Sequence, residues 1–141
     1  MRVILLLLLA AELFSFDSAT ASKIFDKIFH ALIAKEKISV YSVNTTYRDV
    51  LANAPGLYLS TDCMEADIVL VDDFNEIPPG ELGCEKPLFA TSYPVYKRTK
   101  SAVGAFYWDR GRIKIEFSKS RLRDHNMTLP ENFKKYISDD L

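Results

Sequence analysis

The pattern of apolar and polar positions along the chain predicts alternating helices and strands. Residues 22–35 repeat apolar side chains every three or four positions, which is typical of an amphipathic helix with Ser22 as its N-cap. Residues 38–43 alternate apolar and polar side chains and are rich in β-branched and aromatic types, which predicts a strand. Residues 67–71 and 87–91 are short continuous apolar runs, which are typical of central strands buried on both faces.

A β-hairpin is predicted over residues 101–117, with the sequence SAVGAFYWDRGRIKIEF. Its strands are expected at 102–108 and 112–117, joined by a turn over residues 109–111. Gly111 suits this turn because glycine adopts positive φ without strain. The second strand alternates charged and apolar side chains, so we expect it at the edge of the sheet.

Shorter elements fill the remaining chain. They are a helix after Asn44, a strand at 57–60 and helical segments near 95–98, 119–125 and 133–137. Together the patterns predict an α/β layered sandwich: a mainly parallel sheet, helices on its faces, and a C-terminal antiparallel hairpin at its edge.

The N-terminal segment has the organisation of a secretory signal peptide. Arg2 precedes the apolar run 3–11, and Ala19-Thr20-Ala21 fits the small-residue cleavage pattern. The run is shorter than the 18 or so residues that a membrane span requires. We therefore expect cleavage after Ala21, a periplasmic protein, and a single domain over residues 22–141 of the 141-residue chain, with an uncleaved N-terminal anchor as the alternative.

The formal net charge of the whole chain is only −1, but the charge is unevenly distributed. Acidic residues exceed basic ones by five in residues 22–96, and basic residues exceed acidic ones by five in residues 97–141. A basic C-terminal face would favour an acidic partner, although a chance distribution of surface charge is an alternative. No basic helix or stacking motif suggests nucleic-acid binding.

Two cysteines, Cys63 and Cys84, follow the predicted cleavage point. Each precedes a predicted buried strand by a few residues. If these strands are parallel neighbours, both thiols lie at the same end of the sheet, within reach of a disulfide. We expect a structural disulfide, with a redox-sensing thiol pair as the alternative.

Polar residues follow both predicted central strands. Asp72 and Asp73 come after the first strand, and Thr91 and Ser92 come after the second. Because α/β sheets bind ligands at the carboxyl ends of their strands, these four residues are candidates for ligand binding. No catalytic motif occurs, so we expect no enzymatic activity, metal or cofactor. Hydrolase activity is kept as an alternative function.

The hairpin also carries the residue types that recur at interface hot spots. Tyr107, Trp108, Arg110 and Arg112 are therefore candidates for partner binding. The alternative is that Phe106 and Trp108 pack under a neighbouring helix.

Three segments resemble the YfiR-like family of periplasmic regulatory proteins: KPLFATSY at 86–93, GAFYWDRGRIKIEF at 104–117, and the terminal segment 121–137. The resemblance implies a non-enzymatic regulator that holds a membrane-bound diguanylate cyclase or sensor in check through its periplasmic domain, with disulfides influencing that control. A second copy of the chain is an alternative partner. An alternative function is small-ligand binding by a relative of one lobe of a transporter substrate-binding protein.

Overall fold

The computed structural model describes residues 17–79 and 84–138, which contain one seven-stranded sheet. The strand order is β2-β1-β3-β4-β5-β6-β7. The strands are β1 (Ile38–Tyr41), β2 (Leu57–Leu59), β3 (Ile68–Val71), β4 (Leu88–Ala90), β5 (Ala102–Asp109), β6 (Arg112–Ser118) and β7 (Ile137–Ser138). The first five are parallel, β6 is antiparallel to β5, and β7 adds a short parallel pairing to β6. The predicted α/β fold is confirmed, whereas β7 was not foreseen.

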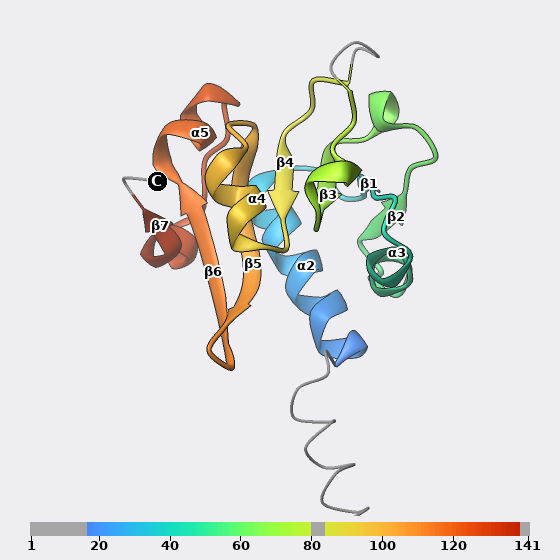
Figure 1. Ribbon diagram of the computed structural model, residues 1–141, viewed down its shortest axis with the longest axis horizontal. Helices are drawn as coiled ribbons and strands as arrows, with labels where there is room; N and C mark the ends of the chain where they lie inside the picture. Colours follow the sequence, from blue (N-terminus) through green and yellow to red (C-terminus); the bar gives the residue numbers. More distant parts are fainter. Residues whose placement is uncertain (1–16, 80–83, 139–141) are drawn as a thin grey trace, which may run out of the picture.

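Helices lie on both faces of the sheet, with α4 in front and α2 behind in Figure 1. The α-helices are α2 (Ser18–Leu32), α3 (Thr45–Ala52), α4 (Tyr93–Arg98) and α5 (Lys119–Asp124). Three short 3-10 helices are η1 (Cys63–Glu65), η2 (Phe74–Glu76) and η4 (Glu131–Tyr136). Within residues 17–79 and 84–138, no helix is long and apolar enough to cross a membrane.

The sheet is buried between two apolar clusters. All of β3 is buried, with Ile68 and Leu70 in the cluster against α2 and Val69 and Val71 in the cluster against α4. This distribution confirms that the continuous apolar run marks a strand covered on both faces. On the α2 side, the ring of Phe25 lies edge-on to other aromatic rings, which ties the helix to the centre of the sheet.

The first described helix begins four residues earlier than the sequence predicted. Asp17, and not Ser22, is the N-cap of α2, because its carboxylate accepts a hydrogen bond from the N–H of Ala19. Ala21 is buried, and the Ser22 hydroxyl donates to the carbonyl of Val50 in α3. Residues 18–21 of the predicted signal segment thus belong to the helix. Cleavage after Ala21 remains a prediction, and residues 1–16 lie outside the described residues.

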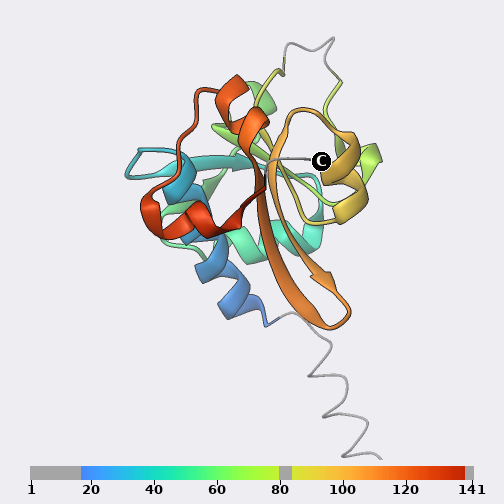
Figure 2. The same ribbon diagram turned by 90° about the vertical axis from the view of Figure 1, so that its left-hand side faces the viewer.

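The predicted hairpin is present and its strands are slightly longer than expected. Pairing runs without interruption from Gly104 opposite Phe117 to Asp109 opposite Arg112. Arg110 and Gly111 have φ values of 53° and 78°, as the two-residue type I′ turn requires. In both views the end of the hairpin projects past the other strands (Figures 1 and 2).

Gly104 in β5 is needed for close packing. A Cβ atom there would lie 2.7 Å from a ring carbon of Phe117 and 2.8 Å from the carbonyl oxygen of Glu116. The register of β4 against β5 shifts at the same place, where Leu88 pairs with Ala102 but Phe89 pairs with Gly104. Glycine thus allows β6 to pack closely against β5 at the same position where the register against β4 shifts.

His30 of α2 is surrounded by oxygen acceptors. Its Nδ1 lies 2.8 Å from the carbonyl oxygen of Asp26 and 2.8 Å from the carboxylate of the same residue. Its Nε2 lies 2.9 Å from the carbonyl oxygen of Glu36. Burial acts to lower the pKa of His30, but the Glu36 and Asp26 acceptors outweigh it, so the pKa is raised.

The stability contribution of His30 should therefore depend on pH. A raised folded-state pKa stabilises the fold fully below the unfolded value of about 6.5, and this stabilisation is lost as pH rises through the folded-state pKa. We expect His30→Gln to lower the free energy of unfolding more at about pH 6 than at about pH 8.5. The difference should stay below about 1 kcal/mol, because the imidazole is partly exposed. Urea unfolding of both proteins at the two pH values measures it, and equal losses would contradict the expectation.

Candidate functional site

The carboxyl ends of the parallel strands form the edge of the sheet where polar side chains gather. The chain leaves β1 towards β2 on one side and later returns to β3 on the other, so the strand order reverses between β1 and β3. Open α/β sheets bind ligands beside such a reversal. Asn44 follows β1, Asp72 follows β3 and Thr91 follows β4 at this edge.

These side chains form one hydrogen-bonded network. The Thr91 hydroxyl donates to the Asp72 carboxylate at 2.6 Å. The Glu76 carboxylate accepts from the backbone N–H of Asp72 at 2.9 Å and from the side-chain amide of Asn44 at 3.2 Å. Burial raises the pKa of Tyr47 beside this network, despite an opposing interaction with Thr91. Much of the polar capacity at the reversal is therefore used within the chain.

The four residues predicted to bind a ligand divide into two groups. Asp72 and Thr91 are brought together by the network. Asp73 instead caps η2, since its carboxylate accepts from the N–H of Asn75 at 3.2 Å, and Ser92 caps α4 through the N–H of Val95 at 3.4 Å. The predicted residues thus share one edge of the sheet, but they do not converge on one point.

A hollow of about 640 Å³ lies farther along the same edge, between the start of α4 and the hairpin. Six of the residues that line it are Thr91, Ser92, Tyr93, Tyr107, Lys114 and Glu116. Burial and the neighbouring Glu116 carboxylate raise the pKa of Tyr107 well above its ordinary value. Its hydroxyl is therefore neutral at physiological pH and suited to hydrogen bonding rather than to proton abstraction. No group of three or more potential metal ligands occurs in the described parts of the chain.

The end of the hairpin exposes an apolar pair beside cationic side chains. Trp108 and Ile113 are opposite each other on adjacent strands and are 41% and 44% exposed. Arg110 and Arg112 are exposed at the turn. Tyr107 points to the other face, where its ring lies 5.5 Å from that of Tyr93. Three of the four predicted partner-binding residues are therefore accessible at the tip, and Tyr107 is not.

The predicted alternative of packing beneath a helix applies to one of the two aromatic residues only. Phe106 is 1% exposed and its ring lies 5.3 Å from that of Phe25 in α2. Trp108, two residues farther along the same face, extends past this contact and remains largely exposed.

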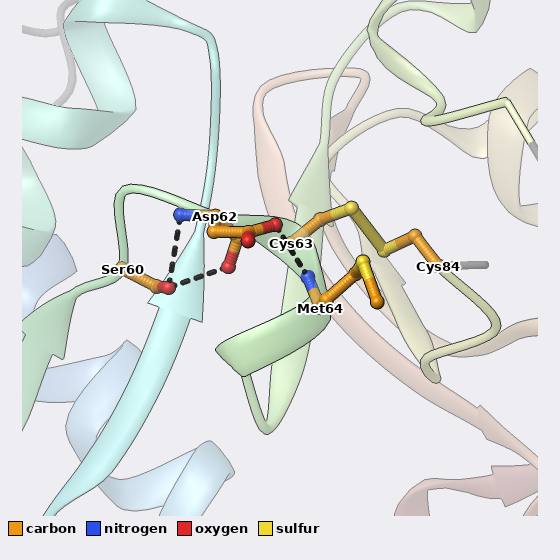
Figure 3. The surroundings of a disulfide bond; sticks show 5 residues. All are labelled: Ser60, Asp62, Cys63, Met64 and Cys84. Atoms are coloured by element: carbon orange, nitrogen blue, oxygen red, sulfur yellow. Dashed lines mark hydrogen bonds between the residues drawn. A yellow bond between two sulfur atoms is a disulfide. The ribbon is translucent and has the colours of Figure 1, made fainter. Parts of the chain in front are cut away.

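The predicted disulfide joins Cys63 and Cys84, whose Cα atoms lie 5.9 Å apart. Figure 3 shows it linking η1 to the segment before β4. As expected, both cysteines precede parallel neighbouring strands, at the edge of the sheet opposite the polar network. A disulfide fits a secreted or periplasmic protein.

Sequence reasoning missed two residues that organise the structure, one at each end of the parallel strands. Glu76 joins the network, and the only signal was its position four residues after Asp72. Arg121 is 9% exposed, and its guanidinium donates to the carbonyls of Tyr96, Lys97 and Ala102. Arg121 stands two residues from Lys119 and from Arg123 in a short helix, a pattern that gave no signal of burial.

Comparison with known proteins supports the fold alone. No family model matches the chain, and no curated protein matches it. A conserved domain protein from Vibrio cholerae O1 biovar El Tor strain N16961 has a similar solved structure, with a TM-score of 0.55 and 9% sequence identity. The match covers 86% of this chain and 59% of that one, so the chain spans less than two thirds of its neighbour's length.

Proposed function

We propose that this chain is an exported, non-enzymatic binding protein that contacts a partner protein through the end of the β5–β6 hairpin. The observation that carries the proposal is the exposure of Trp108 and Ile113, side by side, on a hairpin that projects from the sheet. Apolar residues of this size at a projecting tip mark interaction surfaces. The adjacent arginines add the residue type that is most enriched at hot spots besides the aromatics.

The resemblance to the YfiR-like family suggests the class of partner. In that family the partner is the periplasmic domain of a membrane-bound diguanylate cyclase, and we propose a cyclase or sensor of this kind here. Export by cleavage of the N-terminal segment and a periplasmic location belong to the same proposal. The polar network supports the proposal indirectly. Asp72 and Thr91 bond to each other within the chain, so these groups are less available to a small ligand.

Genetic complementation tests this function. Deleting the gene should raise cyclic-di-GMP in the organism that encodes it, and the wild-type chain should restore the original level. Trp108→Ser should fail to restore it, whereas Tyr58→Ser, which alters a comparably exposed aromatic residue on β2, should succeed. Unchanged cyclic-di-GMP after deletion would exclude regulation of a cyclase.

The hollow beside Tyr107 favours a second candidate, the binding of a small ligand. Its volume of about 640 Å³ is in the range of small-molecule sites. A thermal-shift screen with anions and metabolites distinguishes the two functions. A ligand-dependent increase in melting temperature that Thr91→Val abolishes would favour the ligand-binding function.

A further inference from the structure

The hairpin places an unpaired strand edge next to the exposed apolar pair. In a two-residue hairpin the residues that flank the turn, here Asp109 and Arg112, form a hydrogen-bonded pair. Bonding then alternates along β6. Lys114 and Glu116 therefore direct their backbone groups towards β5, whereas Ile113 and Ile115 direct theirs away from it.

The outer side of β6 is partly covered by η4 and β7. η4 lies beside β6, and its Phe133 and Tyr136 line a hollow together with Ile115. β7 pairs with Phe117 and Ser118. Within residues 17–79 and 84–138, no strand pairs with the outer side of β6 at Ile113 or Ile115. The outward N–H and C=O groups of Ile113 and Ile115 thus pair with no strand of the described residues, and such an edge is a template for another strand.

A second copy of this chain fits the edge poorly. An antiparallel copy that bonds through both isoleucines would pair Ile113 with Ile115 of the other copy. That register places Lys114 opposite Lys114, and like charges directly opposite each other are destabilising. If Ile113 of one copy pairs with Ile113 of the other, Arg112 lies opposite Lys114. If Ile115 pairs with Ile115, Ile113 must pair with Phe117, which β7 already occupies.

The charges favour a different occupant. Arg112 and Lys114 lie near the turn on one face of β6, which also carries Glu116 farther along. Asp109 is opposite Arg112, and its carboxylate lies 3.4 Å from the Lys114 ammonium group. The opposite face carries Ile113 and Ile115, with Trp108 beside them. Beside the turn, a strand added here would have Arg112 and Lys114 as neighbours on one face and apolar side chains on the other.

We infer that the partner docks by adding an extended segment to the outer edge of β6, in which acidic residues alternate with apolar ones. The acidic side chains face Arg112 and Lys114, and the apolar ones cover Ile113 and Trp108. The backbone groups of Ile113 and Ile115 supply up to four hydrogen bonds, the source of affinity in strand addition. This inference rests on the proposed function, because it specifies how the hairpin binds.

Two synthetic peptides test the docking mode on the full exported chain. The first is acetyl-Thr-Val-Glu-Val-Glu-Val-Thr-amide, and its control carries lysine in place of both glutamates. Trp108 is the only tryptophan of the chain, so its fluorescence reports binding directly. We expect the glutamate peptide to bind and the lysine peptide to bind at least fivefold more weakly. Lys114→Glu should reverse this preference.

Amide hydrogen exchange identifies the contact. The N–H groups of Ile113 and Ile115 should become protected when the glutamate peptide binds, whereas that of Lys114, already bonded to β5, should not change. Ile113→Pro removes one outward donor and none that serves β5, so it should weaken binding about fivefold, as the loss of one hydrogen bond predicts. Lys114→Glu provides the test if Ile113→Pro does not fold.

The outcomes separate this inference from the function on which it rests. Fluorescence changes without protection of Ile113 and Ile115 would overturn strand addition, while the tip would remain a binding surface. No binding of the glutamate peptide at about 1 mM, the weak limit for a specific contact, would also overturn it. Protection that depends on protein concentration without peptide would identify a second copy as the occupant and overturn the inference. Failure of the complementation experiment would overturn the proposed function itself.

Discussion

Replacing both Cys63 and Cys84 with serine is expected to lower the free energy of unfolding by about 3 kcal/mol. The disulfide joins residues 21 positions apart and so restricts the unfolded chain, and closing a loop of this length is worth roughly that amount. It also holds η1 against the segment that leads into β4 (Figure 3). Urea unfolding of the variant and of the wild-type chain measures the difference.

Reductant supplies the matched control. Dithiothreitol should destabilise the wild-type chain by a similar amount and leave the double serine variant unchanged. Two titratable thiols in the native exported protein would contradict the disulfide. A bond that opens and closes reversibly under mild redox conditions, with a change in partner binding, would favour the redox-sensing alternative.

The strands could be predicted because burial on two faces leaves a distinct pattern. β3 has no polar residue in Ile68–Val71, and both of its faces are covered. The hairpin was visible from alternation together with Gly111, whose positive φ the turn needs. β7 was invisible for the opposite reason. It is two residues long, and its pairing with Phe117 depends on how the terminal segment packs, not on any local pattern.

The start of α2 shows how a local signal can mislead. Ser22 is a good N-cap type, but Asp17 is a cap as well, and the residues between them favour continuing the helix. Burial of Ala21 and the bond from Ser22 to α3 are tertiary effects that decide between the two caps. Cleavage after Ala21 would remove the Asp17 cap, so the position of cleavage bears directly on the stability of this helix.

The candidate site could be predicted only in outline. The rule that strand ends share an edge brought Asp72 and Thr91 together correctly. The same rule could not indicate that Asp73 and Ser92 cap helices, or that Glu76 accepts from two donors of the network. Such assignments depend on which hydrogen-bond partners the loops bring near, and the sequence contains several equivalent choices.

Arg121 joins three elements near the hairpin, and no carboxylate of residues 17–79 and 84–138 forms an ion pair with it. Its guanidinium donates to the carbonyls of Tyr96 and Lys97, in the last turn of α4, and to that of Ala102 at the start of β5. These helix-end carbonyls have no partner within the helix, so the cation takes the place of a C-terminal cap. Burial lowers the pKa of Arg121, while the ring of Tyr96, 5.4 Å from the guanidinium carbon, adds a favourable contact.

Arg121→Met should therefore lower the free energy of unfolding by about 4 kcal/mol, since it leaves buried carbonyl groups without donors. Methionine retains much of the aliphatic volume, so the loss reflects hydrogen bonding more than packing. Arg123→Met is the matched control, because Arg123 is exposed on the same helix, and it should change stability by no more than about 0.5 kcal/mol. Urea unfolding of both variants measures the contrast, and equal midpoints would show that Arg121 does not hold α4 and α5 together. Because Arg121 also bonds to the carbonyl of Ala102 at the start of β5, we expect amides of β5 to exchange faster in Arg121→Met than in Arg123→Met.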